Sequence, residues 1–132
     1  MIEFFPKNLL KGRIVDFDNP SVSARYRLND IFCSAWLSHA ITAIVRFKIP
    51  DFFNGKPIHI DELSRVSGLH SPTLYRVMRA LAANGIFIET RSGEFAQNDV
   101  SLLLKSDSSQ SWAAMAKMWN HSSCINAWLH FA

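Results

Sequence analysis

The sequence predicts a mainly α-helical domain of winged helix-turn-helix type, with a small β-hairpin as the wing and additional helices at both ends. Residues 60–73 and 74–87 have the pattern of two helices separated by a turn, and Asn84-Gly85 ends the second. The segments "IFIET" and "EFAQN" flank Arg91-Ser92-Gly93, a short turn that is typical of a hairpin. Apolar residues also recur at helical spacing before and after this central part.

Composition predicts one folded domain with a hydrophobic core. Of the 132 residues, 48% are hydrophobic and 19% are charged, which is typical of a globular chain. The net charge of +3 is small, and residues 59–90 hold three arginines against three acidic residues. A surface that binds duplex DNA concentrates positive charge where it meets phosphate, so we do not expect nucleic acid as a partner. Two distant cysteines, Cys33 and Cys124, favour a reducing, cytoplasmic location.

The first third of the chain predicts an irregular arm and one long helix. Pro6, Gly12 and Pro20 interrupt residues 1–22, and the helix is expected from Ser23 or Asn29 to about Phe47. Apolar residues occupy almost every side of this helix, so we expect it to be buried all round, with one side facing another chain or domain. Its uncharged stretch, residues 31–45, is shorter than the roughly 20 residues that span a bilayer, and no membrane partner is expected.

Turn and cap residues predict the elements that follow. Pro50 is expected to start a short helical turn, and Pro57 an extended segment through Ile60. Asp61 is expected to cap a helix over 61–67 that stops at Gly68. Ser71 is expected to cap the next helix, with Pro72 at its first position.

The C-terminal third predicts exposed amphipathic helices. A brief helix is expected over residues 100–104, and then either two helices or one bent helix. Little of the chain is left to cover the apolar stripe of these helices, so either a partner subunit covers it or the natural protein continues beyond Ala132. The stripe consists of Trp112, Met115, Ala116, Trp119, Ile125, Trp128, Leu129 and Ala132.

No pattern in the chain predicts catalytic, cofactor-binding or metal-binding residues. The five glycines are too far apart for a nucleotide-binding loop, and the five histidines show no metal-ligand spacing. Asp61 and Glu62 are interpreted as acids at a helix start, and His59 as an exposed strand residue.

The order of short motifs resembles the N-terminal dimerisation domain of S-adenosylmethionine-dependent small-molecule O-methyltransferases of the caffeate, acetylserotonin and polyketide-tailoring type. The resemblance runs from about Asp30 to the end of the chain. One departure is Phe47-Lys48, where the family usually has a Leu-Gly pair. The motifs are Ile49-Pro50-Asp51 with Phe52-Phe53, Glu62-Leu63, residues 74–81, Asn84-Gly85-Ile86-Phe87, Gly93-Glu94-Phe95 and Trp128-Leu129.

The resemblance implies a homodimer in which the winged-helix element packs within the dimer and helps to wall the partner's substrate pocket. It also implies S-adenosylmethionine for a full-length enzyme, bound by a separate or missing catalytic domain and not by this segment. Without that domain the chain is expected to be inactive. His121 and His130 lie before the position of that domain, so neither inherits a catalytic role.

These inferences divide the chain into an arm (1–22), a winged-helix-like dimerisation domain (23–105) and helices (106–132) that lead toward the absent catalytic domain. The acceptor substrate is not predicted. The interface guesses, which ordinary intrachain packing would explain equally well, are Leu37, Ile41, Ile44, Val45, Trp112, Met115 and Trp119.

Two alternative functions stay open. A winged-helix DNA-binding transcription regulator would use Thr73, Arg76 and Arg79 in the groove and Arg91 on the wing. More often, arginines in such a helix are solvated or ion-paired. A separate partner protein that docks another chain through its aromatic C-terminal stripe is the second alternative.

Overall fold

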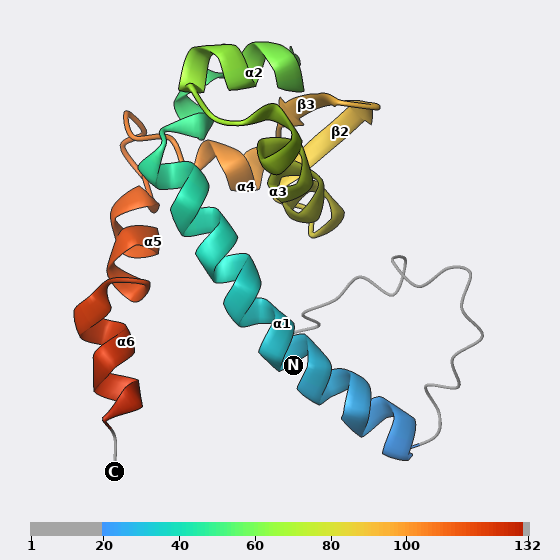
Figure 1. Ribbon diagram of the computed structural model, residues 1–132, viewed down its shortest axis with the longest axis vertical. Coiled ribbons are helices and arrows are strands. Elements are labelled where there is room, and N and C mark those ends of the chain that lie inside the picture. Colours follow the sequence, from blue (N-terminus) through green and yellow to red (C-terminus); the bar gives the residue numbers. More distant parts are fainter. Residues whose placement is uncertain (1–19, 131–132) are drawn as a thin grey trace. The chain divides into compact units, whose positions relative to one another are not determined.

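A computed structural model describes residues 20–130 of the chain (Figure 1). Most of the predicted N-terminal arm and Ala132 therefore lie outside the described residues. The chain divides into two units, residues 1–37 and residues 38–132, and the boundary between them falls within the first helix.

Helix α1 (Pro20–Arg46) is longer than expected and begins at Pro20, ahead of Ser23 and Asn29. Proline is compatible with a helix start, because its φ is fixed near the helical value and the first N–H groups have no helical partner. The expectation that α1 is buried all round is wrong for its first part. Leu28, Phe32 and Trp36 are 55%, 70% and 76% exposed. Periodicity shows that a helix is apolar but does not supply the atoms that cover it.

A 24-residue segment of α1, Ser23–Arg46, is long and apolar enough to cross a membrane by length and composition alone. The uncharged stretch within it is residues 31–45, as expected, and the longer segment passes because a few charged side chains on either side are compatible with the test. Core helices of soluble proteins pass the same test, so a chain without a membrane partner stays a prediction.

The second unit contains the end of α1, the further helices α2 to α6 and a three-stranded antiparallel sheet, which confirms the mainly α fold with a small β-hairpin. The strands lie in the order β1-β3-β2, and Ile58 of β1 pairs with Phe95 of β3. The elements are η2 (Ile49–Phe52, a 3-10 helix), β1 (Ile58–His59), α2 (Ile60–Ser67), α3 (Ser71–Ala83), β2 (Phe87–Arg91), β3 (Glu94–Gln97), α4 (Asp99–Leu102), α5 (Ala113–Trp119) and α6 (Ser122–Leu129).

Both predicted helix caps are displaced toward the N-terminus. His59 caps α2, because its Nδ1 accepts a hydrogen bond from the Asp61 N–H at 3.3 Å. Asp61 lies in the first turn, and its carboxylate accepts a bond from the Ser71 hydroxyl at 3.0 Å. His70 takes the cap position of α3, and Ser71 lies inside that helix. The brief helix predicted at 100–104 is α4, which Asn98 caps through the N–H groups of Val100 and Ser101.

The hairpin turn requires glycine at residue 93. Gly93 has φ 77°, and a Cβ atom there would lie 3.0 Å from His59 Nε2. The Ile60 N–H donates to the Gly93 carbonyl at 2.7 Å, which ties the start of α2 to the hairpin. The turn therefore also fixes the helix that follows β1.

Lys48 links α1 to η2 in a strained conformation. Its φ of 55° and ψ of 28° lie in the left-handed region, and it is the one described non-glycine residue with positive φ. This conformation costs a residue with a Cβ atom about 1–2 kcal/mol. The resemblance places a glycine here, and the structure shows why glycine suits the position.

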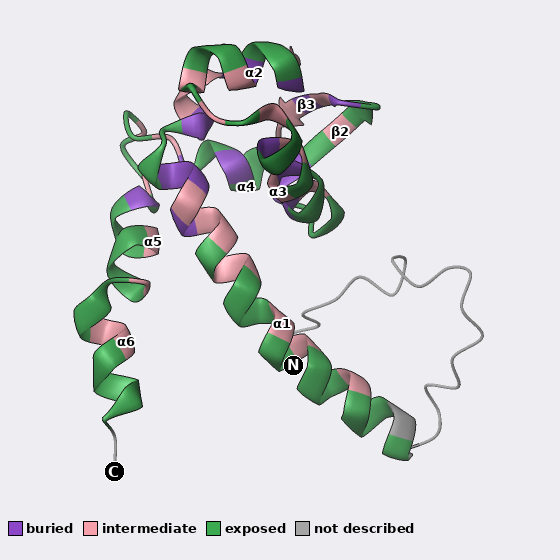
Figure 2. Ribbon diagram, in the orientation of Figure 1, coloured by how far each residue is buried: buried purple, intermediate pink, exposed green. Residues whose placement is uncertain are grey.

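The core lies where α2 and α3 pack against the sheet and the end of α1 (Figure 2). Its aromatic side chains contact one another, with ring centroids 5.5 Å apart for Phe53 and Phe87 and 6.1 Å for Tyr75 and Phe95. The buried apolar side chains are Ile44, Val45, Ile49, Phe53, Ile60, Leu63, Leu74, Met78, Leu81, Ile86, Phe87, Phe95, Leu104 and Ala113.

Candidate dimerisation surface

Helices α5 and α6 follow one another with a break at Asn120-His121, so the two-helix alternative holds (Figure 1). Asn120 ends α5, and His121 caps α6 by accepting the Ser123 N–H at Nδ1, 3.3 Å away. The Ser111 hydroxyl accepts the Ala113 N–H at 3.1 Å at the start of α5. Helix α6 thus has its own side-chain cap, whereas Trp112 at the cap position of α5 makes no such bond.

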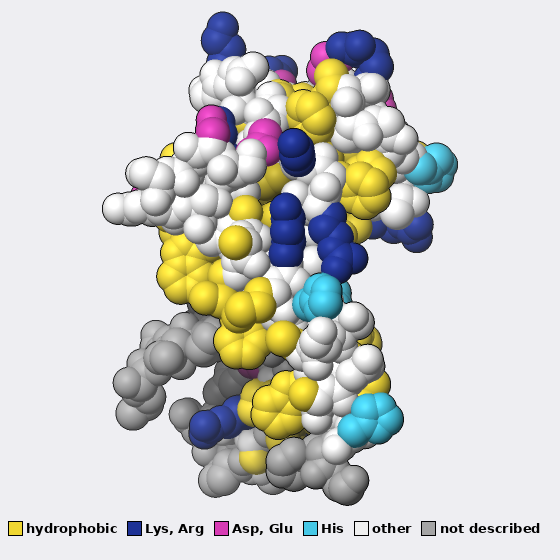
Figure 3. Space-filling model, turned by 90° about the vertical axis from the view of Figure 1, so that its left-hand side faces the viewer, with side chains coloured by type: hydrophobic (Ala, Val, Ile, Leu, Met, Phe, Trp, Pro, Cys, Tyr) yellow, Lys and Arg dark blue, Asp and Glu magenta, His cyan; other side chains and the backbone are white. Residues whose placement is uncertain are grey.

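Large apolar side chains of α5 and α6 are exposed. Among the described residues of α5 and α6, Ala113 is the only apolar residue that is buried. Figure 3 shows apolar side chains gathered on the face of the molecule that carries these helices. We call the following set the C-terminal apolar face: Trp112 (57% exposed), Met115 (37%), Met118 (47%), Trp119 (59%), Trp128 (73%) and Leu129 (72%).

The interface candidates on α1 lie in different surroundings. Ile44 and Val45 are 2% and 4% exposed, so they belong to the core of this chain. Leu37 and Ile41 are partly exposed. Trp112, Met115 and Trp119 lie on the C-terminal apolar face. That any of the seven contacts a second copy stays a prediction.

Sequence reasoning did not select Leu28, Phe32 and Trp36, although each of them is more than half exposed on α1. They recur every four residues, which places them on one face of the helix. That spacing could have identified them. The expectation that α1 is buried on all sides did not distinguish these three positions from the other apolar positions of the helix.

Three of the four residues that the DNA-binding alternative selects are engaged within the chain. The Arg79 guanidinium lies 3.6 Å from the Glu89 carboxylate and 5.7 Å from the Tyr75 ring centroid. Arg91 bonds to Glu94 at 3.0 Å, and the Thr73 hydroxyl lies 3.0 Å from His70 Nδ1. Arg76 is exposed on α3. Glu89 and Glu94 thus place negative charge beside the cations that would have to meet phosphate.

Glu89 joins the helix to the hairpin. Its carboxylate accepts hydrogen bonds from the Tyr75 hydroxyl at 3.2 Å and from the Gly93 N–H at 3.1 Å, in addition to the Arg79 ion pair. These contacts hold the exposed side of α3 against the turn between β2 and β3. They give α3 and the hairpin a structural role within the chain.

Hydrogen bonds lower the pKa values of two carboxyl groups, those of Glu62 and Glu94. The Thr90 hydroxyl at 2.7 Å, followed by the Arg91 guanidinium, holds the pKa of Glu94 below its usual value of 4.5. A bidentate bond from Arg65 lowers the pKa of Glu62 in the same way. Both groups stay ionised and serve local ion pairs.

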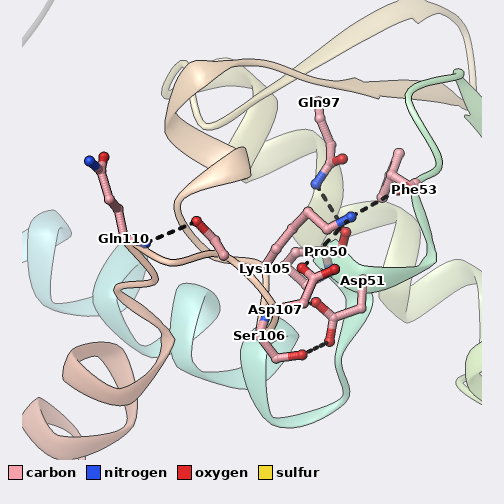
Figure 4. A network of polar contacts seen from close by, with 9 residues as sticks. Pro50, Asp51, Phe53, Gln97, Lys105, Ser106, Asp107 and Gln110 are labelled. Carbon is pink, nitrogen blue, oxygen red and sulfur yellow. Dashed lines mark hydrogen bonds and ion pairs between the residues drawn. The ribbon is translucent and has the colours of Figure 1, made fainter.

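The Ile49-Pro50-Asp51 motif anchors the segment after α4 (Figure 4). The Asp51 carboxylate accepts the Ser106 N–H at 2.8 Å and the Ser106 hydroxyl at 2.7 Å. Gln97 Nε2 donates to the Pro50 carbonyl at 2.9 Å. The motif therefore closes a loop of the fold over more than 50 residues of sequence, and its acid is used as a hydrogen-bond acceptor within the chain.

Among the described residues, no buried polar side chain is left without a hydrogen-bond partner. The buried polar side chains there are Thr42 and Ser101, and both bond within the chain. Gly55, Gly68, Gly85 and Gly93 all have positive φ and lie in turns or at helix ends. Between residues 20 and 130, no group of three His, Cys, Asp or Glu side chains could hold a metal ion.

The family model of the O-methyltransferase dimerisation domain matches residues 29–107, which is more than half of the chain. Des-methyl DIF-1 methyltransferase A of Dictyostelium discoideum is 30% identical over 105 residues, covering 78% of this chain and 29% of that protein. The mitomycin biosynthesis 6-O-methyltransferase of Streptomyces lavendulae is 34% identical over 95 residues, covering 68% and 27%.

Solved structures show the same likeness. The structure of the mitomycin 7-O-methyltransferase superposes with a TM-score of 0.75 at 30% identity, covering 83% of this chain and 32% of that one. The chain thus spans less than a third of the length of each of these three proteins.

Proposed function

Because this chain belongs to the O-methyltransferase dimerisation domain family, we propose that it joins two copies of a small-molecule O-methyltransferase. The observation that carries the proposal is the C-terminal apolar face, which this chain leaves exposed. A monomeric protein seldom exposes several large aromatic side chains along two consecutive helices. Tryptophan and methionine are also enriched where protein surfaces associate.

The free energy of burying the exposed tryptophans indicates how much surface a stable dimer needs. Burying a large apolar side chain contributes roughly 1.5–3 kcal/mol, so three tryptophans contribute roughly 5–9 kcal/mol. That corresponds to a dissociation constant between about 0.2 mM and just below 1 μM, before the entropic cost of association is subtracted. A stable dimer therefore needs more than the C-terminal apolar face. Exposed apolar residues of α1, among them Leu28, Phe32 and Trp36, are available for it.

Methyl transfer would take place on residues outside this segment. We place S-adenosylmethionine there, since the buried polar side chains of the described residues already bond within the chain. The present chain would contribute the pairing surface and part of the wall of the partner's substrate pocket. We expect the protein to be cytoplasmic, with itself and a methyltransferase catalytic domain as partners.

Sedimentation velocity of the 132-residue chain tests the pairing. We expect a dimer that dissociates on dilution, and we expect Trp119→Asp to shift the equilibrium strongly toward monomer. Ile88→Asp is the matched control, because Ile88 is 48% exposed on β2 and lies outside the C-terminal apolar face. A strictly monomeric wild-type chain at high micromolar concentration would overturn the proposal. If Trp119→Asp and Ile88→Asp weakened dimerisation equally, the assignment of the C-terminal apolar face as the interface would be wrong.

A further inference from the structure

Nothing in the local sequence requires helix α5 to end at residue 119. The segment 113–129 contains no glycine and no proline, the residues that ordinarily break a helix. His121 caps α6 locally, but a cap marks where a helix begins and does not by itself end the helix before it. Contacts with other parts of the chain also bear on the break.

Those contacts come from α1. The Thr42 hydroxyl lies 2.7 Å from the Ala116 carbonyl of α5 and 3.0 Å from the Ser38 carbonyl. Asn120 Nδ2 donates to Thr42 Oγ1 at 2.7 Å and to Ser38 Oγ at 2.9 Å. It also lies 3.2 Å from the Ser38 carbonyl. We call Ser38, Thr42, Ala116 and Asn120 the polar clasp.

The hydrogen bonds of the polar clasp run in one direction, from donor to acceptor. Thr42 has one hydroxyl proton, and the shorter of its two bonds leads to Ala116. Its oxygen is then left to accept the Asn120 amide proton, so the chain of donors runs from Asn120 through Thr42 to Ala116. Thr42 is 4% exposed, so an unmade bond would leave a buried hydroxyl without a partner.

The Ala116 carbonyl belongs to the last turn of α5. The last four carbonyls of a helix have no partner in that helix and need one from elsewhere. Residue 120 could satisfy Ala116 through its backbone N–H if the helix continued, but that N–H points to the Met118 carbonyl instead. The Thr42 hydroxyl takes its place, and the Asn120 side chain is turned back toward α1.

We propose that the polar clasp causes the break between α5 and α6. Thr42 and Asn120 act as positioning residues: they end α5 from outside and so set the direction in which α6 leaves. Without the clasp, residues 113–129 form one continuous helix. The proposal concerns contacts within one chain and does not depend on dimerisation.

The test is Thr42→Val, which removes the hydroxyl and keeps the shape, with Thr42→Ser as the control that retains a donor. The readouts are backbone carbon chemical shifts and amide hydrogen exchange in the full chain. With Thr42→Val, we expect the shifts of residues 120–122 to move to helical values. We also expect exchange at the Asn120 and His121 amides to slow at least tenfold, because each replaces its turn-type bond to the Met118 carbonyl with a regular helical bond. Thr42→Ser should resemble the wild type.

Asn120→Ala provides a second route if Thr42→Val does not fold, since Asn120 is partly exposed and its truncation leaves no buried cavity. Alanine also favours a continuous helix, so Asn120→Asp is measured beside it, because aspartate keeps the shape but cannot donate. Helical shifts across 120–122 in both variants would support the proposal. A retained break in either folded Thr42→Val or Asn120→Asp would overturn it.

Discussion

Helices α3 and α5 are both amphipathic, yet they have opposite surroundings. The apolar face of α3 carries Leu74, Met78 and Leu81, which are at most 4% exposed. By contrast, Trp112 at the cap position of α5 and Trp119 at its end are both more than half exposed. The difference shows that an apolar stripe specifies a face to be covered, while the covering atoms come from the rest of the chain or from another molecule.

The hairpin and α2 explain the difference. They pack against α3 and supply Phe87, Phe95 and Leu63, each at most 1% exposed. No described element does the same for α6, none of whose residues is buried. The packed unit, by which we mean α2, α3 and the sheet, is therefore stabilised by its own contacts. The C-terminal apolar face would gain stabilising free energy only if another surface covered it.

Phe95→Ala should have the largest effect on the packed unit. Truncating a fully buried phenylalanine costs about 3–5 kcal/mol of unfolding free energy, and Phe95 is 0% exposed. Leu129→Ala is the matched test on the C-terminal apolar face, where the residue is 72% exposed. Its effect should stay within about 0.5 kcal/mol. Urea unfolding at a concentration at which the chain is monomeric measures both, and equal losses would contradict the comparison.

Trp112→Ala and Trp119→Ala should act on association. An interface aromatic at a hot spot contributes about 2 kcal/mol or more, equivalent to roughly a 30-fold change in dissociation constant. The Tm of the wild-type chain should rise with protein concentration, because pairing stabilises the folded state by mass action. Each variant should flatten that rise. Val66→Ala, on a 37% exposed residue of α2, should not.

Lys48→Gly should stabilise the junction between α1 and the packed unit. A left-handed residue with a Cβ atom costs about 1–2 kcal/mol, and glycine loses about 0.5–1 kcal/mol more entropy than alanine on folding. The expected net gain is roughly 0.5–1 kcal/mol by thermal unfolding. Lys48→Ala keeps the strain and should show no such gain. A glycine variant no more stable than the alanine variant would show that the left-handed conformation is not strained.

Lowering the pH should reduce the stability of the folded chain by protonating Glu94 of the hairpin. We expect this to be the smallest of the four predicted effects. The pKa of Glu94 lies lower in the folded than in the unfolded chain, so its contribution is present above about pH 4.5 and is lost as the pH falls through the folded value. Glu94→Gln should make unfolding less dependent on pH in that range. Thr90→Val should act in the same direction, because it removes the main donor. An unchanged pH dependence in both variants would contradict the assignment.

The elements could be predicted from the sequence where local chemistry specifies them. The hairpin followed from the turn at Gly93, and the end of α3 from Asn84-Gly85. The caps were misplaced by one or two residues because histidine, at positions 59 and 70, is a less familiar cap than aspartate or serine. The polar clasp could not be predicted, since residues 42 and 120 are joined only by the fold.

The composition of the C-terminal apolar face also sets how fast it can find a partner. From residue 108 to 132, Lys117 is the only Lys, Arg, Asp or Glu. Long-range attraction between charges, which speeds encounter for many complexes, has almost nothing to act on here. Association should therefore proceed at the unassisted rate, about 10⁵–10⁶ M⁻¹s⁻¹, and hardly change with ionic strength. Selectivity for the correct partner would then be decided after encounter, by how slowly the fitted pair separates.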